Sequence, residues 1–249
     1  SNIVWFPKLN SFTNNAKVQV GTASPIIVAE NVALGESAIT FTSDSEEVKT
    51  IGHFVPVSKQ ALADSNFLKS YVDGRLLYGL QYKIDTELLT GSGLVGTIEG
   101  IYTGRTAYSM DSPLSYTTKL DVLRDAKAQL QTTNYSTANT FCVLNPQDWA
   151  DIELTKETAG MYVFSNPGGV IAQTIWGMRV VLSNSMTAGT FLVGNGDEAQ
   201  VWSRANAEVS ISYEDSTNFQ KEMATLKAVE RIALTIYNSG GFIGGTFSV

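Results

Sequence analysis

Residues Val55–Ile101 have the sequence VPVSKQALADSNFLKSYVDGRLLYGLQYKIDTELLTGSGLVGTIEGI. This stretch predicts a long helix that ends in a turn. Its apolar residues recur mainly at steps of three and four, which is typical of one face of an α-helix. A helix over about residues 65–89 would be a rod roughly 36 Å long at 1.5 Å per residue. Asp64 or Ser65 can cap its start, and Gly91 can take the left-handed conformation that ends it.

Glycines raise two questions about this helix. Gly74 and Gly79 lie inside it, and each costs about 1 kcal/mol relative to alanine, so we expect close packing or a bend there. The run Gly91–Gly96 (GSGLVG) matches the dinucleotide fingerprint G-x-G-x-x-G. That fingerprint follows a strand and opens a helix, whereas this run closes one. We therefore interpret it as a helix stop and a turn, with no bound cofactor.

Composition limits the classes of function. The chain has 249 residues, enough for one large domain or two modest ones, and no apolar run long enough to cross a membrane, so we expect a soluble, cytoplasmic protein. With 17 basic and 24 acidic residues the net charge is -7, which argues against a surface that binds duplex DNA. An acidic balance fits a container for nucleic acid as well as it fits an enzyme.

Candidate catalytic groups are few. Cys142 lies in the apolar run FCVLNP and is expected to be a buried free thiol. His53 is the single histidine, and we expect a packed or hydrogen-bonded core residue, not a base. Too few ligands remain for a zinc site of several thiolates or imidazoles, so no catalytic, metal or cofactor site is predicted. Two acidic clusters are expected to be solvated: Asp44, Glu46 and Glu47, and Asp148, Asp151 and Glu153.

The first 50 or so residues predict a β-ribbon. Lys17–Val20 and Ala38–Thr42 have strand character and are separated by a loop that contains Gly21, Ser24 and Pro25. A two-stranded ribbon alone is marginally stable in water. We therefore expect it to contact something else: a neighbouring subunit, or the core of its own chain as an ordinary edge hairpin.

Helix and strand patterns alternate from about residue 103 to 203, which predicts an α+β unit inserted between two parts of another domain. The expected elements are a helix at Thr118–Gln131, a strand at Thr140–Leu144, a helix opening at Asn145–Asp148, and strands at Met178–Leu182 and Phe191–Val193. Beyond Ala205 the pattern is ambiguous between helix and strands.

The order of short motifs resembles the Hong Kong 97 (HK97) type of tailed-phage major capsid protein. The matching segments are FTNNA at 12–16, AEN and GESAITF within 29–41, VKTIGH at 48–53, the helix above, VLNPQDW at 143–149, WGMRVV at 176–181, VW at 201–202 and GTF at 245–247. The resemblance implies an α+β HK97-like capsid fold with an extended loop over 1–50, a peripheral domain over 51–102 and 204–249, and an axial domain over 103–203. It also favours strands over a helix after Ala205.

The resemblance implies assembly. Pentamers and hexamers of the chain would form the icosahedral shell of a virion, enclosing DNA without sequence-specific binding and without a membrane, after assembly in the host cytoplasm. Further partners that the resemblance implies are a scaffold, a protease, a portal or decoration proteins. Candidate intersubunit contacts lie in the extended loop and in two loops of the axial domain: Gly21, Thr22, Ser24, Pro25, Glu36, Ser165, Asn166, Gly168 and Asn184.

The sequence departs from the family pattern in three ways. Some members form an isopeptide cross-link from a Lys, an Asn and a Glu, but here Leu34, Glu222 and Val229 occupy those positions, so we expect no cross-link. The stretch Lys17–Val28 is longer than its counterpart and would add contact in place of covalent bonds. The family's N-terminal arm is absent from the sequence, and truncation, disorder and cleavage all remain open as the cause.

Other functions remain as alternatives. An encapsulin-type nanocompartment shares the fold, but its cargo groove usually needs an N-terminal helix that the sequence lacks. A monomeric binding module would explain the strands and the aromatic content. A hydrolase that uses unrecognised carboxylates ranks last.

Overall fold

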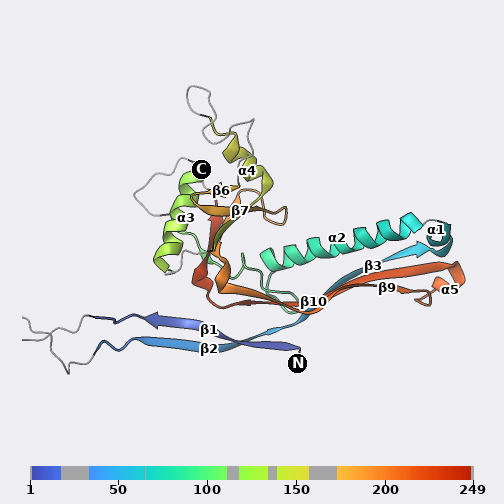
Figure 1. Cartoon of the computed structure of the whole chain (residues 1–249), viewed down its shortest axis with the longest axis horizontal. Coiled ribbons are helices and arrows are strands. Elements are labelled where there is room, and N and C mark those ends of the chain that lie inside the picture. Colours follow the sequence, from blue (N-terminus) through green and yellow to red (C-terminus); the bar gives the residue numbers. More distant parts are fainter. Residues whose placement is uncertain are drawn as a thin grey trace, which may run out of the picture.

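The computed structural model describes residues 2–17, 34–64, 66–110, 118–133, 139–156 and 173–247. Figure 1 shows an elongated molecule with three parts: a helix along a long sheet, a more compact group of strands and helices, and a separate two-stranded ribbon. The ribbon runs from near the middle of the molecule toward the end opposite to helix α1 (Lys59–Asp64).

The long helix α2 spans Asn66–Thr90 and confirms the helix predicted over about 65–89. The buried face of this helix packs against the sheet and carries Leu76, Leu80 and Ile84. Gly91 does not take the predicted left-handed conformation; Gly93 and Gly96 do, with φ of 67° and 92°. A Cβ on Gly91 would lie 2.2 Å from the carbonyl oxygen of Ile98, so close approach of the backbone explains this glycine.

Below α2 lies a three-stranded antiparallel sheet in the order β3 (Lys49–Ser58), β10 (Met223–Ile236), β9 (Ala199–Ser212). The strands predicted after Ala205 are therefore confirmed, and the alternative helical interpretation is wrong. Leu226, Ala228 and Ile232 of the central strand are fully buried in the same apolar cluster as α2. The short helix α5 (Asn218–Lys221) makes the turn between β9 and β10.

The compact part is built on a six-stranded mixed sheet. Its order is β4 (Thr106–Ala107), β11 (Phe242–Thr246), β8 (Thr190–Asn195), β5 (Thr140–Leu144), β7 (Met178–Leu182), β6 (Thr174–Ile175). Helices α3 (Lys119–Thr133) and α4 (Pro146–Glu153) share its apolar core. Two short 3-10 helices, Gly196–Glu198 and Ser239–Gly241, precede β9 and β11.

The elements predicted between 118 and 193 are confirmed. The start of α4 follows directly from the sequence, because the side chain of Asn145 accepts a bond from the backbone N–H of Gln147 and Pro146 occupies the first turn. The predicted division into extended loop, peripheral and axial domains stays a prediction. The strand β11, which that division assigns to the peripheral residues, is hydrogen-bonded within the six-stranded sheet.

The ribbon consists of β1 (Ile3–Thr13) and β2 (Ala38–Glu47), paired antiparallel. The strand predicted at Ala38–Thr42 is confirmed, whereas that at Lys17–Val20 falls mostly outside the described residues and Lys17 itself lies outside any strand. The strand β1 was not predicted. Pro7 in its middle is the reason, because proline within a run weakens the strand signal.

Candidate functional site

The base of the ribbon is attached to β10 and to the residue that follows this strand. The ring of Phe6 meets that of Tyr237 edge to face at 5.7 Å between centroids, and the backbone N–H of Leu9 donates to the Tyr237 carbonyl at 3.0 Å. A guanidinium nitrogen of Arg231 donates to Oδ1 of Asn2 at 3.1 Å. These contacts fix the direction in which the ribbon leaves the body.

Apart from these contacts, the described ribbon is largely solvent-exposed. Trp5 is 67% exposed and Phe41 59%, and Phe12 and Ile39 are also exposed. Large apolar side chains gathered on a surface typically mark an interaction site. The ribbon is therefore the candidate assembly surface of the chain.

The candidate contact residues are distributed as follows. Gly21, Thr22, Ser24, Pro25, Ser165, Asn166 and Gly168 lie outside the described residues. Glu36 is exposed in the ribbon, and its carbonyl accepts a bond from the side chain of Asn15 at 2.9 Å. Asn184 is exposed in the turn after β7, and the neighbouring Ser185 hydroxyl bonds that of Thr86 on α2 at 2.9 Å. The Asn184 turn is thus seated on α2 of its own chain.

The three cross-link positions lie in two separate parts of the chain. Leu34 is exposed beside the ribbon. Glu222 takes a left-handed conformation at the end of α5, with φ of 52°, and its carboxylate pairs with Lys59 at 3.2 Å. Val229 lies in the middle of β10, opposite Gly52 on one side and Glu208 on the other.

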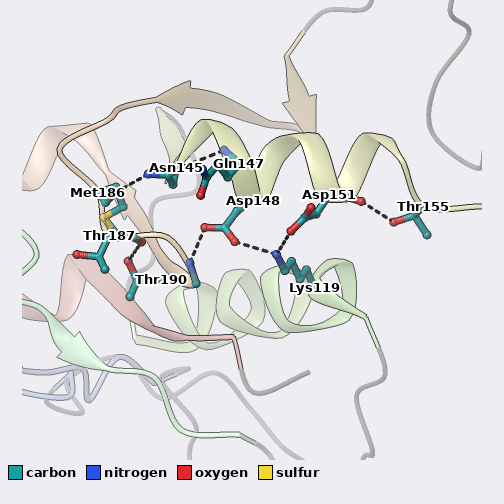
Figure 2. A network of polar contacts seen from close by, with 10 residues as sticks. Lys119, Asn145, Gln147, Asp148, Asp151, Thr155, Met186, Thr187 and Thr190 are labelled. Carbon is teal, nitrogen blue, oxygen red and sulfur yellow. Dashed lines mark hydrogen bonds and ion pairs between the residues drawn. The ribbon is translucent and has the colours of Figure 1, made fainter.

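Asp148 corrects the expectation that both acidic clusters are solvated. It is 3% exposed, and its two carboxylate oxygens accept bonds from Lys119 and from the backbone N–H of Gly189, both at 2.8 Å. Figure 2 shows the Lys119 amine between Asp148 and Asp151, which also accepts at 2.8 Å. Burial disfavours the charged amine, but the two carboxylates outweigh burial and raise the pKa of Lys119.

This network connects α3, α4 and the turn before β8, and it also contacts the end of the described chain. The Lys119 amine lies 5.4 Å from the centroid of the Phe247 ring, and the N–H of Phe247 donates to the Gly189 carbonyl at 2.8 Å. Every group in it has a structural partner. The network therefore holds the compact part together and offers no reactive pair.

The other candidate chemical groups also have structural roles. Cys142 is fully buried, as predicted, and burial raises the pKa of its thiol, which disfavours the reactive thiolate. Nε2 of His53 is hydrogen-bonded to the Leu76 carbonyl at 2.8 Å, as expected, but His53 is an exposed residue of β3 and not a core residue. Among the described residues, no group of three or more His, Cys, Asp or Glu is placed to hold a metal ion. No helix in the described ranges is long and apolar enough to span a membrane.

Residues 8–247 match the phage capsid family. The chain belongs to this family. It is 39% identical over 249 residues to the major capsid protein of Enterobacteria phage HK97, an alignment that covers 100% of this chain and 62% of that protein. The chain thus spans less than two thirds of the relative's length.

Solved structures agree on the fold. The capsid of a native GTA particle aligns with a TM-score of 0.73 at 14% identity, covering 100% of this chain and 86% of that one. A chain of Mycobacterium phage Adephagia aligns with a TM-score of 0.73 at 12% identity, with coverage of 100% and 86%. A virus-like particle from Pyrococcus furiosus follows at 0.62 and 10% identity, with coverage of 98% and 86%. The predicted α+β, HK97-like capsid fold is confirmed.

Proposed function

We propose that this chain is the structural subunit of a phage head: it forms pentamers and hexamers that close into an icosahedral shell around DNA, without covalent cross-links. The match of residues 8–247 to the phage capsid family is the observation that carries the proposal. The likeness to the capsid of an assembled particle supports self-assembly as the activity of the fold.

Assembly of this kind requires two different surfaces on one subunit, because head-to-tail contacts around a ring are heterologous. The exposed ribbon is one such surface, and we assign its partner to the adjacent copy. The compact part, with its Asn184 turn, would point to the ring centre. Individual contacts can be weak, since many copies hold the shell together by multivalency.

Enclosed DNA needs no specific binding surface on this subunit. The net charge of -7 supports a lining that does not hold phosphates tightly, so DNA can move in and out. The proposed place of the protein is therefore the virion shell, after assembly in the host cytoplasm. Contact with a scaffold, protease, portal or decoration protein is part of the same proposal.

We propose the absence of a cross-link because the side chains at the three positions lack the groups that an isopeptide bond requires. An isopeptide bond forms when a lysine amine displaces ammonia from an asparagine carboxamide while a carboxylate takes the proton. Leu34 has no amine, Glu222 has a carboxylate in place of the carboxamide, and Val229 cannot act as a base. Mass spectrometry of dissolved shells under denaturing conditions should give the monomer mass, and covalent oligomers would contradict this part of the proposal.

A cellular protein shell is the second candidate, because the virus-like particle from Pyrococcus furiosus has the same fold. The test that separates the two begins with electron microscopy of the purified protein. Shells or capsomer-sized rings support assembly, and a monomer at high concentration across a range of salt opposes it. Shells recovered from infected or expressing cells should contain DNA if the phage proposal is right, and a cargo protein if the alternative is right.

A further inference from the structure

We infer that the solvent-facing side of α2 binds the same side of α2 in a second copy of this chain, as an antiparallel pair around a two-fold axis. The α2 seam is defined as Tyr71, Arg75, Tyr78, Tyr82 and Asp85. This inference rests on the proposed function and adds a contact of a second kind. Contacts around a ring are heterologous, whereas a two-fold contact joins identical surfaces.

The seam lies on the side of α2 opposite to the sheet. At about 100° per residue, its five positions fall within roughly 40° of the direction opposite to Leu80, which is buried against the sheet. Tyr71 is 49% exposed, Tyr78 63% and Tyr82 48%, and the arginine and the aspartate of the seam are exposed as well. In Figure 1 the described elements leave this side of α2 uncovered except near its C-terminal end, where the compact part lies.

The spacing of the seam is that of a helix–helix contact. From residue 71 the steps are four, three, four and three, so the positions alternate between the d and a places of a heptad. Such a stripe follows one side of a helix and can meet the same stripe of another helix at a crossing angle of about 20°. Tyrosine and arginine, which make up most of the seam, are enriched at the centres of protein interfaces.

The order of residues along the seam is self-complementary for an antiparallel partner. Positions 78 and 82 are each two residues from position 80, and positions 75 and 85 are each five residues from it. With the two-fold axis at residue 80, Tyr78 of each copy lies opposite Tyr82 of the other, and Arg75 lies opposite Asp85. A parallel pair would instead place Arg75 opposite Arg75 and Asp85 opposite Asp85, and like charges repel. The sequence of the seam therefore favours the antiparallel pair.

Both charged residues of the seam are available to a partner. Nε of Arg75 donates to the Tyr71 hydroxyl at 3.2 Å, and the guanidinium lies 5.3 Å from the centroid of the Tyr71 ring. This bond uses one of the five N–H donors of the guanidinium and orients the others. Asp85 forms no ion pair within the described ranges, whereas the adjacent part of α2 has its own pair, from Lys83 to Glu87 at 2.7 Å.

The seam borders a recess that can receive an aromatic ring. Residues 182–185, at the end of β7 and in the turn after it, form one wall of this recess. The other wall belongs to α2 and consists of Tyr78, Gln81, Tyr82 and Asp85. In the antiparallel pair, the Tyr78 ring of the second copy would enter the recess beside Tyr82, and the same contact would form at the symmetry-related site. The turn includes Asn184, one of the contact residues predicted from the sequence.

The seam is too small to hold a dimer together in solution. Aromatic side chains bury about 150–250 Å² each, so the three tyrosines at their observed exposure offer roughly 300 Å² per copy. A stable interface needs about 800 Å² per partner. The pair should therefore form within an assembled shell, where other contacts bring the two helices together, and not between free subunits.

The occupant we assign to the seam is a second copy because of the symmetry of its charges. A partner of another kind would not require a cation and an anion at equal distances on either side of the two tyrosines. The likeness in fold to the capsid of a native GTA particle, an assembly of subunits, supports the same choice. A scaffold or decoration protein on this side of α2 is an outcome of the test.

The first experiment exchanges the charges of the seam and measures the protein concentration at which purified subunits assemble into shells. Arg75→Asp and Asp85→Arg each place like charges opposite one another at both ends of the pair, and each should raise this concentration by about tenfold. The double variant Arg75→Asp/Asp85→Arg restores opposite charges between the copies and should assemble within about twofold of the wild type.

The matched control is Arg124→Asp, which makes the same change of charge at an exposed position of α3. It should assemble like the wild type, and this result would exclude net charge as the cause of the effect. Rescue by the double variant excludes misfolding, because two residues ten positions apart on one helix are too far apart to compensate each other within a chain. A double variant as impaired as the single variants would overturn the inference.

A second experiment identifies the partner by photo-cross-linking. Shells are assembled from a mixture of isotope-labelled and unlabelled protein that carries benzophenone at position 78, and the cross-linked peptides are analysed by mass spectrometry. Peptides that join α2 of a labelled copy to α2 of an unlabelled copy are the expected result. Cross-links to another segment or to another protein would overturn this inference and leave the proposed function intact. Wild-type protein that never forms shells would overturn both.

Discussion

Phe6 and Tyr237 meet with their ring planes at 83° and their centroids 5.7 Å apart, and this contact joins the ribbon to the sheet below α2. In the described part of the ribbon, Phe6 is the one side chain that is fully buried. The Tyr237 hydroxyl is fixed in turn by Gln200, with 2.7 Å between the oxygens. The angle of the ribbon therefore depends on one aromatic pair, the side-chain hydrogen bond from Arg231 to Asn2 and a few backbone bonds.

We expect Phe6→Ala to loosen the base of the ribbon. Truncation of a buried aromatic costs about 3–5 kcal/mol in a closed core, and we expect about 1–3 kcal/mol here because the site lies at the edge of the body. Hydrogen exchange of backbone amides in β1 and β2 should speed up. Phe12→Ala, at an exposed position of the same strand, is the control and should leave exchange and the free energy of unfolding nearly unchanged.

Asp148 should be far more important for stability than Asp151. Asp148→Ala leaves the Gly189 N–H without its acceptor and Lys119 with only an exposed partner, so a loss of about 3 kcal/mol is expected. The Asp151 side chain is 65% exposed, and Asp151→Ala should cost no more than about 1 kcal/mol. Denaturant unfolding of the two variants measures the difference, and equal losses would show that Asp148 is not the anchor.

The raised pKa of Lys119 also predicts a loss of folding stability at alkaline pH. Its pKa is raised in the folded chain, so the contribution is fully present below the unfolded value of about 10.4 and is lost as the pH rises through the folded value. Lys119→Met, which keeps the apolar stem, should therefore be less stable than the wild type at pH 8. The gap should narrow as the pH rises above the unfolded value of about 10.4 and through the folded one. A gap that does not change with pH would assign the effect to packing.

The two glycines inside α2 should respond in opposite ways to alanine. Among the described residues, no atom outside the local helix backbone lies within 4 Å of a Cβ built on Gly74. Gly74→Ala should therefore stabilise by about 1 kcal/mol through helix propensity. A Cβ on Gly79 would lie 2.9 Å from Cε1 of His53 and would force that ring off its bond to Leu76. Gly79→Ala should therefore stabilise much less or destabilise. In a His53→Ala background the gain should reappear, and thermal unfolding of the double-mutant cycle tests this coupling.

Glu46 should oppose folding at neutral pH. Burial first, then the charges of Glu99 and Asp44, raise its pKa above 4.5, so the folded chain holds the proton more tightly than the unfolded chain does. Stability is lost as the pH rises from 4.5 through the raised value. Glu46→Gln should thus stabilise at pH 7 by up to about 1 kcal/mol after solvent screening, with no gain below pH 4. Glu47→Gln is the control: Lys49 lowers the pKa of Glu47, so its removal should not stabilise.

Local signals were sufficient for much of the fold. The helix α2, the cap of α4 at Asn145, and the strands β5, β7 and β8 have apolar periods and turn residues that agree with their final environment. The strands after Ala205 needed the family resemblance, because the buried residues of β10 come in consecutive runs and do not alternate with exposed ones. Periodicity alone does not separate such a strand from a buried helix. The candidate contact residues stay a prediction, because most of them lie outside the described residues.

At particular residues, contacts with distant parts of the chain gave an environment that the local sequence did not predict. Asp148 occurs in an acidic run that would be solvated on an isolated helix, yet Lys119 from α3 and the Gly189 turn enclose it. Gly91 is a glycine because the Ile98 carbonyl approaches it, which is a contact between two turns and not a local dihedral preference. The apolar residues Ile3, Trp5 and Leu9 of β1 follow a period of two, but Pro7 lies within it and the extra residue at Asn10 moves Phe12 out of it.

The amino-acid order by itself determined the long helix, the strands β5, β7 and β8, and the family. Periodicity, caps and turns act over neighbouring residues, and the family motifs keep their order along the chain. The three-dimensional arrangement decided which acid is buried, which glycine is crowded and which side of the ribbon is apolar. Those outcomes depend on strand register and on groups brought together from distant positions, and a one-residue change in register reverses every side chain of a strand.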